Sequence, residues 1–320
     1  MSLLIPVISP VLSSMVARII LLCFVRASSK HISHTIFKHV RGTSMNFKKI
    51  TKDVKISALG LGTFGMGEGR VAGISDDEKD VEAIRLGIEL GITHIDTAER
   101  YASGHSEEVV ADAIEPFKRR ELFITTKVWH NHLRHDDLIA SLEESLKRLR
   151  QDYVDLYLVH WPNPEVSLEE TMGALEYCAE EGWTRQIGVS NFSAELIVEA
   201  QSHLKEHTLV ADQVHYSLLN QDPRDEILPY CQKNNIILIS YTPLARGKLA
   251  MPGNSVLDEL VEKYDRTHAQ ISLNWLISQE NVVAIPKASN PVHLRENLGA
   301  VDWMLDKEDW QRLSESFTIA

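Results

Sequence analysis

The chain has 320 residues, of which 44% are apolar and 24% charged, a composition typical of a globular protein with one large domain or two small ones. Its net charge of −12 argues against a basic surface for nucleic acid. Cys23, Cys178 and Cys231 form no CxxC pair, which favours free thiols in a reducing compartment over a disulfide framework.

Residues 1–44 differ in composition from the rest of the chain. They hold eight serines, five basic residues and no acid, so removing these five charges from −12 leaves −17 for 45–320. The apolar run at 19–25 is far shorter than the roughly 20 residues of a membrane span. No basic stretch precedes it, as it would in a signal peptide, whereas a transit-like presequence fits the composition. We favour a true start at Met45, with 1–44 disordered or outside the fold and 45–320 forming a single domain.

Beyond Met45, short apolar runs alternate with longer amphipathic stretches. The segment 47–57 alternates polar and apolar residues like a β-hairpin. Eight further runs are strand-like, each followed by a helical pattern, and they lie at 59–64, 93–97, 122–127, 154–160, 187–191, 211–217, 237–243 and 282–288. The segment 306–316 predicts one more helix.

Eight strand-and-helix units predict an α/β fold, a (β/α)8 TIM barrel. Several of the strand-like runs are continuously apolar, as parallel strands covered on both faces are. The units span about 240 residues, the usual size of such a barrel. A doubly wound sheet would need fewer strands per domain and a boundary, and no Pro/Gly/Ser-rich linker lies near the middle of the chain. We expect the hairpin to close the barrel bottom and the last helix to be an addition.

Two motifs suggest sites that their context does not support. The segment 59–67 satisfies G-x-G-x-x-G, but a dinucleotide fingerprint requires a helix to begin there, and further glycines predict a loop. The segment HNHLRH at 130–135 has a tempting spacing for a metal, yet neither cysteine nor a well-placed pair of acids supports it. We therefore expect polar loop histidines and no metal.

Polar side chains stand at the carboxyl ends of the predicted strands, where (β/α)8 barrels place their chemistry. They are Asp96, Tyr101, Lys127, His160, Ser190, Asn191, Gln213, Tyr241 and Lys287. Each alone has an ordinary structural explanation, such as a helix cap or a satisfied core group. Together they converge on one end of the barrel, which predicts an active site.

Four of these residues suit proton donation to a carbonyl. A free tyrosine has a pKa near 10, and a neighbouring ammonium such as Lys127 would lower that of Tyr101. A buried ammonium needs a carboxylate partner, for which Asp96 is the candidate. His160 can donate a hydrogen bond to the substrate oxygen. The set contains no activated nucleophile, so it predicts a hydride from a nicotinamide cofactor.

The motifs LGLGTFGMG, HIDTAERYASG, ITTKVW, VDLYLVHWP, GVSNF, YTPLARGKL and IPKASNPVHLRENLGA resemble the aldo-keto reductase superfamily over about 47–300. The short segment after the barrel is similar to that of prokaryotic-type members. The resemblance implies a catalytic tetrad in which Tyr101 is the general acid, Lys127 and Asp96 tune it, and His160 orients the carbonyl. The hydride would come from C4 of the nicotinamide.

The resemblance also implies the cofactor contacts. Tyr241 would stack under the nicotinamide, and Ser190, Asn191 and Gln213 would bind its carboxamide. The other implied contacts at the cofactor mouth and along the pyrophosphate are Asp96, Gly62, Thr63, Phe64, Pro243, Leu244, Arg246, Lys248, Ile285 and Asn297.

The family usually prefers NADPH, and Lys287 matches a residue that binds its 2′-phosphate. The position six residues later, often Arg in the family, is His293 here, and Arg295 can substitute for it. Ser289 and Asn290 offer polar contacts nearby. NADPH is therefore the expected cofactor, and use of NADH stays open.

The implied substrate pocket is aromatic, with Phe64, Trp129 and Trp161 around His160. Such a pocket suits small aldehydes and α-dicarbonyls, and the short C-terminal segment predicts an open site with broad acceptance. We expect a cytoplasmic monomer that binds a small carbonyl substrate and neither nucleic acid nor membrane.

Two other functions stay open. Some relatives are potassium-channel β subunits, which hold cofactor while they serve a partner. A Schiff-base aldolase on a similar barrel would use Lys127 as its nucleophile, but it has no use for Tyr101 or for the carboxamide contacts of GVSNF at 188–192.

Overall fold

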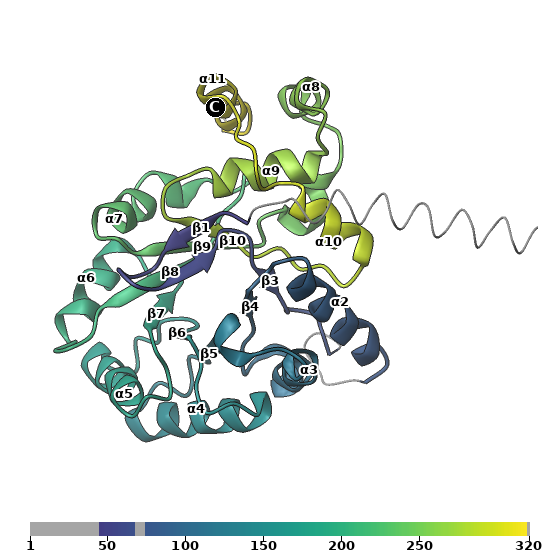
Figure 1. Ribbon diagram of the computed structural model, residues 1–320. Coiled ribbons are helices and arrows are strands. Elements are labelled where there is room, and N and C mark those ends of the chain that lie inside the picture. The colour runs from purple at the N-terminus through teal and green to yellow at the C-terminus, as the bar shows by residue number, and fades with distance from the viewer. Residues whose placement is uncertain (1–44, 68–73, 319–320) are drawn as a thin grey trace, which may run out of the picture. The chain divides into compact units, whose positions relative to one another are not determined.

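The computed structural model describes residues 45–67 and 74–318 (Figure 1). The predictions for the basic segment 1–44, including a presequence or a mis-assigned start, lie outside the described residues. In the described part of the chain, no helix combines the length and the hydropathy that crossing a membrane requires.

A closed barrel of parallel strands forms the centre of the fold. Its strands are β3 (Leu61–Gly62), β4 (His94–Asp96), β5 (Phe123–Val128), β6 (Leu156–Val159), β7 (Ile187–Ser190), β8 (Leu209–His215), β9 (Ile237–Tyr241) and β10 (Val282–Ala284). Each pairs in parallel with the next in chain order. A parallel bridge between Leu59 and Ala284 joins the last strand to the first, so the predicted (β/α)8 barrel is confirmed.

Helices surround the strands on the outside of the barrel (Figure 1). They are α2 (Asp77–Glu89), α3 (His105–Ile114), α4 (His135–Leu149), α5 (Leu168–Glu180), α6 (Ala194–Ser202), α7 (Ile227–Lys233), α8 (Ser255–Tyr264), α9 (His268–Ile277), α10 (Pro291–Leu298) and α11 (Lys307–Ser316). Side-chain caps fix where several of them begin. Ser167 and Ser193 cap α5 and α6, and Thr267 and Gln270 form a capping box on α9.

The predicted hairpin consists of β1 (Phe47–Lys49) and β2 (Lys55–Ser57), which pair antiparallel. Ile50 and Ile56 are buried in one apolar cluster with Phe123 and Leu156, the first residues of β5 and β6. The hairpin therefore covers the amino ends of the strands, as expected, and leaves the carboxyl ends for the site.

The last helix, α11, packs against α8 outside the barrel (Figure 1). Lys263 of α8 lies 2.6 Å from the carboxylate of Asp309. The indole rings of Trp310 and Trp275 stack with centroids 5.5 Å apart, which ties α11 to α9. The predicted extra helix is thus an addition on the outer layer, away from the strand ends that carry the polar residues.

Candidate active site

Four polar side chains meet at the carboxyl ends of β4, β5 and β6. Asp96 ends β4, Lys127 is the penultimate residue of β5, and His160 directly follows β6. Tyr101 begins the short 3-10 helix Tyr101–Gly104 that follows β4. Nζ of Lys127 lies 2.7 Å from Oδ1 of Asp96 and 3.2 Å from the hydroxyl of Tyr101. The ring centroids of Tyr101 and His160 are 5.7 Å apart. The barrel therefore brings the four predicted catalytic residues together.

Lys127 is a fully buried ammonium with three acceptors. Its Nζ donates to Asp96, to the carbonyl of Thr97 and to the hydroxyl oxygen of Tyr101. Burial alone would lower the pKa of Lys127, but the Asp96 carboxylate and the Tyr101 hydroxyl raise it, and the net direction is upward. A protonated amine is no nucleophile, so this environment argues against Schiff-base chemistry at Lys127.

Asp96 is held from both sides. Its Oδ1 accepts from Lys127, and its Oδ2 accepts from the side-chain amide of Gln213 at 2.7 Å. Burial raises the pKa of Asp96, while the ammonium of Lys127 and the amide of Gln213 act against that rise. The side-chain amide of Gln213, which was expected to bind the nicotinamide carboxamide, therefore already holds the carboxylate of Asp96 in place.

The hydroxyl of Tyr101 contacts the ammonium of Lys127. It accepts a hydrogen bond from Lys127, so its own proton is available to an acceptor in the cavity. The expected lowering of its pKa is not found, because burial raises the pKa of Tyr101 by more than Lys127 lowers it. Tyr101 is consequently protonated near neutral pH, which is the state that a proton donor needs.

His160 is a neutral imidazole at the base of the cavity. Burial, followed by the charges of Lys127 and His130, lowers the pKa of His160 to about 2. Its Nδ1 is buried without a hydrogen-bond partner among the described residues. The aromatic ring of Trp129 lies edge-on, with the two centroids 5.1 Å apart. A neutral ring of this kind can donate one hydrogen bond to a substrate oxygen.

The backbone after Tyr101 is unusual. Ala102 and Ser103 have φ angles of 47° and 55°, and Gly104 follows at 97°. Only glycine adopts such a conformation without cost, and a Cβ at Gly104 would lie 2.8 Å from the side chain of Arg148. The strained turn sits beside the proposed donor and leads directly into α3, so it fixes the path of the chain at Tyr101.

A cavity of about 880 Å³ extends from the tetrad along the strand ends. The predicted site residues that line it are Gly62, Phe64, Asp96, Tyr101, Trp129, His160, Trp161, Ser190, Asn191, Gln213, Tyr241, Pro243, Leu244, Arg246, Ile285, Lys287, His293 and Asn297. Phe64 and Trp161 are among its exposed aromatic side chains. The lining therefore combines the predicted catalytic residues and aromatic side chains with Arg246 and Lys287, which bring positive charge from the segments after β9 and β10.

Five other predicted cofactor residues do not line this cavity. Thr63 is buried beneath it and donates to the carbonyl of Asp96. Ser289 accepts from Lys287, Asn290 caps α10, and Arg295 donates to the carbonyl of Pro291. The fifth is Lys248, in the segment Ala245–Ala250. Their cofactor contacts stay predictions.

The ring of Tyr241 is fixed in place. His215 lies parallel to it, with centroids 5.6 Å apart, and the Tyr241 hydroxyl donates to Oδ1 of Asn191. The amide nitrogen of Asn191 donates to the carbonyl of His160 and to the hydroxyl of Ser190. Hydrogen bonds therefore connect Tyr241, Asn191 and Ser190 to one another, and Asn191 to the backbone of His160 in the tetrad.

The sequence analysis missed several lining residues. They are Arg100, Thr242, Gly247, Ala250, Ala269, Pro286 and Glu296. Most follow from their neighbours in the chain, because a loop that places Pro243 or Lys287 also places the adjacent residues. Arg100 directly precedes Tyr101, and that adjacency was the available signal.

The two rejected motifs have structural roles. His132 lies 3.0 Å from Glu99, and His135 pairs with Asp136. No group of three potential metal ligands was found in the residues that the structure describes. In the glycine-rich segment, a Cβ at Gly62 would meet the carbonyl oxygen of Ile285 at 2.9 Å, so this glycine permits close strand packing.

A model of the Aldo/keto reductase family matches residues 58–317. Methylglyoxal reductase YeaE of Escherichia coli strain K12 is 35% identical over 268 residues, which cover 83% of this chain and 92% of the relative.

Two solved structures are similar in fold as well as sequence. The thermostable aldo-keto reductase Tm1743, in complex with the inhibitor epalrestat, is 46% identical with a TM-score of 0.81, covering 85% of this chain and 100% of that one. An aldo-keto reductase from Klebsiella pneumoniae in complex with NADPH is 33% identical with a TM-score of 0.78, and the match covers 86% and 95%.

Proposed function

This chain is an enzyme of the aldo/keto reductase family, and from that premise we propose that it reduces aldehydes and ketones to alcohols with NADPH, using Tyr101 as the proton donor. The observation that carries the proposal is the hydrogen-bonded set of Tyr101, Lys127 and Asp96 at the end of a long cavity. The similar Klebsiella enzyme binds NADPH.

The lining residues fit that cofactor. Arg246 and Lys287 supply cations for phosphate groups at one end. Tyr241 offers a flat ring at the other, and the hydrogen bond to Asn191 and the parallel His215 hold it still. We infer that the face of Tyr241 away from His215 would hold the nicotinamide. Oε1 of Gln213, for which no hydrogen bond is found among the described residues, and the amide of Asn191 would bind its carboxamide.

NADPH, when bound, would supply the hydride that the carbonyl carbon requires. Tyr101 gives its hydroxyl proton to the carbonyl oxygen, so that the two transfers together yield the alcohol. Lys127 stabilises the charge that develops on the phenolic oxygen, and Asp96 keeps Lys127 charged. Neutral His160 donates a hydrogen bond to the same carbonyl oxygen and sets its direction.

The substrates are small aldehydes and α-dicarbonyls, in keeping with the aromatic side chains of Phe64, Trp129 and Trp161 around the tetrad. The methylglyoxal reductase among the relatives supports this class. We further propose that residues 45–320 act as a single-domain monomer, for which light scattering at several concentrations is the test.

The direct experiment is NADPH oxidation by the purified full chain with methylglyoxal, simple aldehydes, ketones and aldoses. The rate with NADH is measured beside it, and the alcohol product is quantified against NADPH consumed. We expect one alcohol per NADPH and a faster reaction with NADPH than with NADH. No oxidation with any carbonyl would overturn the proposal.

A further inference from the structure

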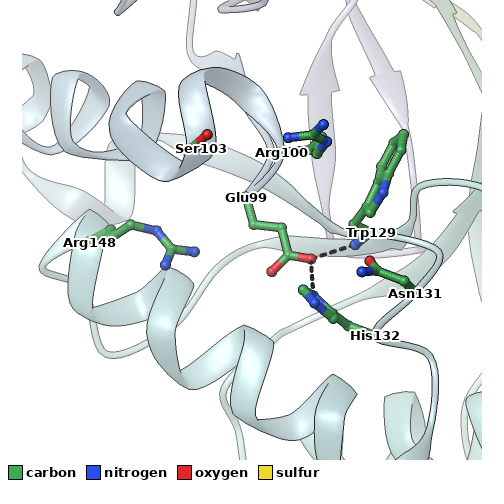
Figure 2. A pocket seen from close by; sticks show the side chains of 7 residues that line it. All are labelled: Glu99, Arg100, Ser103, Trp129, Asn131, His132 and Arg148. Carbon is green, nitrogen blue, oxygen red and sulfur yellow. Dashed lines mark hydrogen bonds and ion pairs between the residues drawn. The ribbon is translucent and has the colours of Figure 1, made fainter. Parts of the chain in front are cut away.

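A second, smaller cavity adjoins the catalytic one. It has a volume of about 380 Å³, and Arg100 and Ser103, which flank Tyr101 in the chain, are among the residues that line it (Figure 2). Arg100 and Trp129 line both cavities. The guanidinium of Arg100 lies 5.5 Å from the ring centroid of Trp129, and the Trp129 ring lies nearly perpendicular to that of His160. Arg100 therefore stands at the boundary between the two spaces, next to the residues that would hold a carbonyl.

Arg100 has no acidic partner within the described residues. Its neighbour Glu99 is turned away, because one carboxylate oxygen of Glu99 accepts from the backbone N–H of Trp129 at 2.6 Å and contacts His132 at 3.0 Å (Figure 2). The other arginine of the small cavity, Arg148, is paired with buried Glu107 at 2.6 Å. Among the described residues, no hydrogen bond or salt bridge to Arg100 is found, and Arg100 is exposed, so its charge is solvated by water and is not neutralised by a protein carboxylate.

The other cations that line the large cavity, Arg246 and Lys287, lie on segments far from Arg100 in the chain. Arg246 and Lys287 follow β9 and β10, and the proposed function assigns them to the cofactor phosphates. Arg100 instead precedes Tyr101 and lies over the aromatic wall. A carbonyl bound between Tyr101 and His160 would consequently share its cavity with one guanidinium that the proposed cofactor contacts do not use.

We propose that Arg100 selects carbonyl substrates that carry a carboxylate, by binding that group while the carbonyl faces Tyr101. The planar guanidinium offers paired donors that match a carboxylate, and the indole of Trp129 supports its flat face. The preferred substrates are thus oxo acids and aldehyde acids. This inference rests on the proposed function and deepens it, because it names the class within the carbonyls.

The test uses two probes of one shape, 4-formylbenzoate and its neutral methyl ester. Values of kcat/KM with NADPH are measured for the wild type, Arg100→Gln, Arg100→Lys and the control Arg120→Gln. Arg120 is an exposed arginine that precedes β5, and its replacement changes the net charge equally without touching either cavity. The readout is the ratio of kcat/KM for the acid to that for the ester.

We expect Arg100→Gln to lower this ratio roughly tenfold, which corresponds to about 1.4 kcal/mol. Arg100→Lys should give an intermediate ratio, because it keeps the charge and loses the paired geometry. Arg120→Gln should leave the ratio at the wild-type value. The proposal that Arg100 selects carboxylate substrates would be overturned by an unchanged ratio in Arg100→Gln. It would also be overturned if the ratio fell equally in Arg100→Gln and in the control Arg120→Gln. A wild type that reduces neither probe, nor any other carbonyl, would instead overturn the proposed function itself.

Discussion

Breaking the buried pair of Asp96 and Lys127 should destabilise the protein, and removing both charges together should restore much of the loss. The two side chains are 1% and 0% exposed, and their charged atoms are 2.7 Å apart. Removing one partner of such a pair leaves an uncompensated buried charge, which costs about 3–5 kcal/mol of unfolding free energy. We therefore expect that loss in Asp96→Asn and in Lys127→Met. The double variant has no buried ion, so its loss should be smaller than that of either single variant.

Urea unfolding of the four proteins at pH 5 and pH 8 measures these free energies. Burial raises the pKa of Asp96, and Lys127→Met removes the ammonium that acts against this rise. Asp96 of the variant should therefore be protonated at low pH, and the stability of the variant should fall as the pH rises. The penalty of this variant should consequently be larger at pH 8. Losses that simply add in the double variant would refute the pairing argument, and a pH-independent penalty in Lys127→Met would refute the assignment of the buried charge to Asp96.

Three other outcomes are expected. Lys287→Met should raise the KM for NADPH about tenfold or more, because a charge-assisted hydrogen bond contributes roughly 1.5–3 kcal/mol. The KM for NADH should stay unchanged, and an equal rise for both cofactors would argue against a contact between Lys287 and the 2′-phosphate. Burial raises the pKa of Asp212, on β8, well above its usual range, so the wild type should lose stability relative to Asp212→Asn as the pH rises from 5 to 8. Urea unfolding would measure this loss, and parallel pH profiles of the two proteins would contradict it. Because the pKa of Tyr101 is raised and that of His160 is about 2, kcat for carbonyl reduction should stay constant from pH 6 to pH 9; a fall near pH 7 would assign proton donation to another group.

The barrel and the meeting of the tetrad could be predicted because they follow from chain order. Parallel strands buried on both faces leave an apolar signature, and the last polar residue of each run must face the same end of the barrel. This rule alone was enough to predict that Asp96, Lys127 and His160 lie close together. The hairpin was equally visible, because the segment around Ile50 and Ile56 alternates and precedes the first barrel strand.

Other features depend on contacts that the sequence does not encode locally. The left-handed turn at Ala102 and Ser103 contradicts the ordinary preference of both residue types, so only the surrounding structure imposes it. The direction of the Glu99 carboxylate decides whether Arg100 is neutralised, and a backbone N–H sets that direction. The pKa of Tyr101 was expected to fall because Lys127 is near, but the extent of burial was unknown and has the larger effect.

Replacement of Tyr101 by phenylalanine tests the central claim most directly. Single-turnover oxidation of bound NADPH by methylglyoxal is measured for the wild type, Tyr101→Phe and the control Tyr177→Phe, whose ring lies on α5 and packs against Trp183. NADPH binding is followed separately by fluorescence. We expect Tyr101→Phe to bind NADPH normally and to react about 10²–10⁴-fold more slowly, as the loss of a general acid implies, with Tyr177→Phe like the wild type. Turnover by Tyr101→Phe at the wild-type rate would contradict the account.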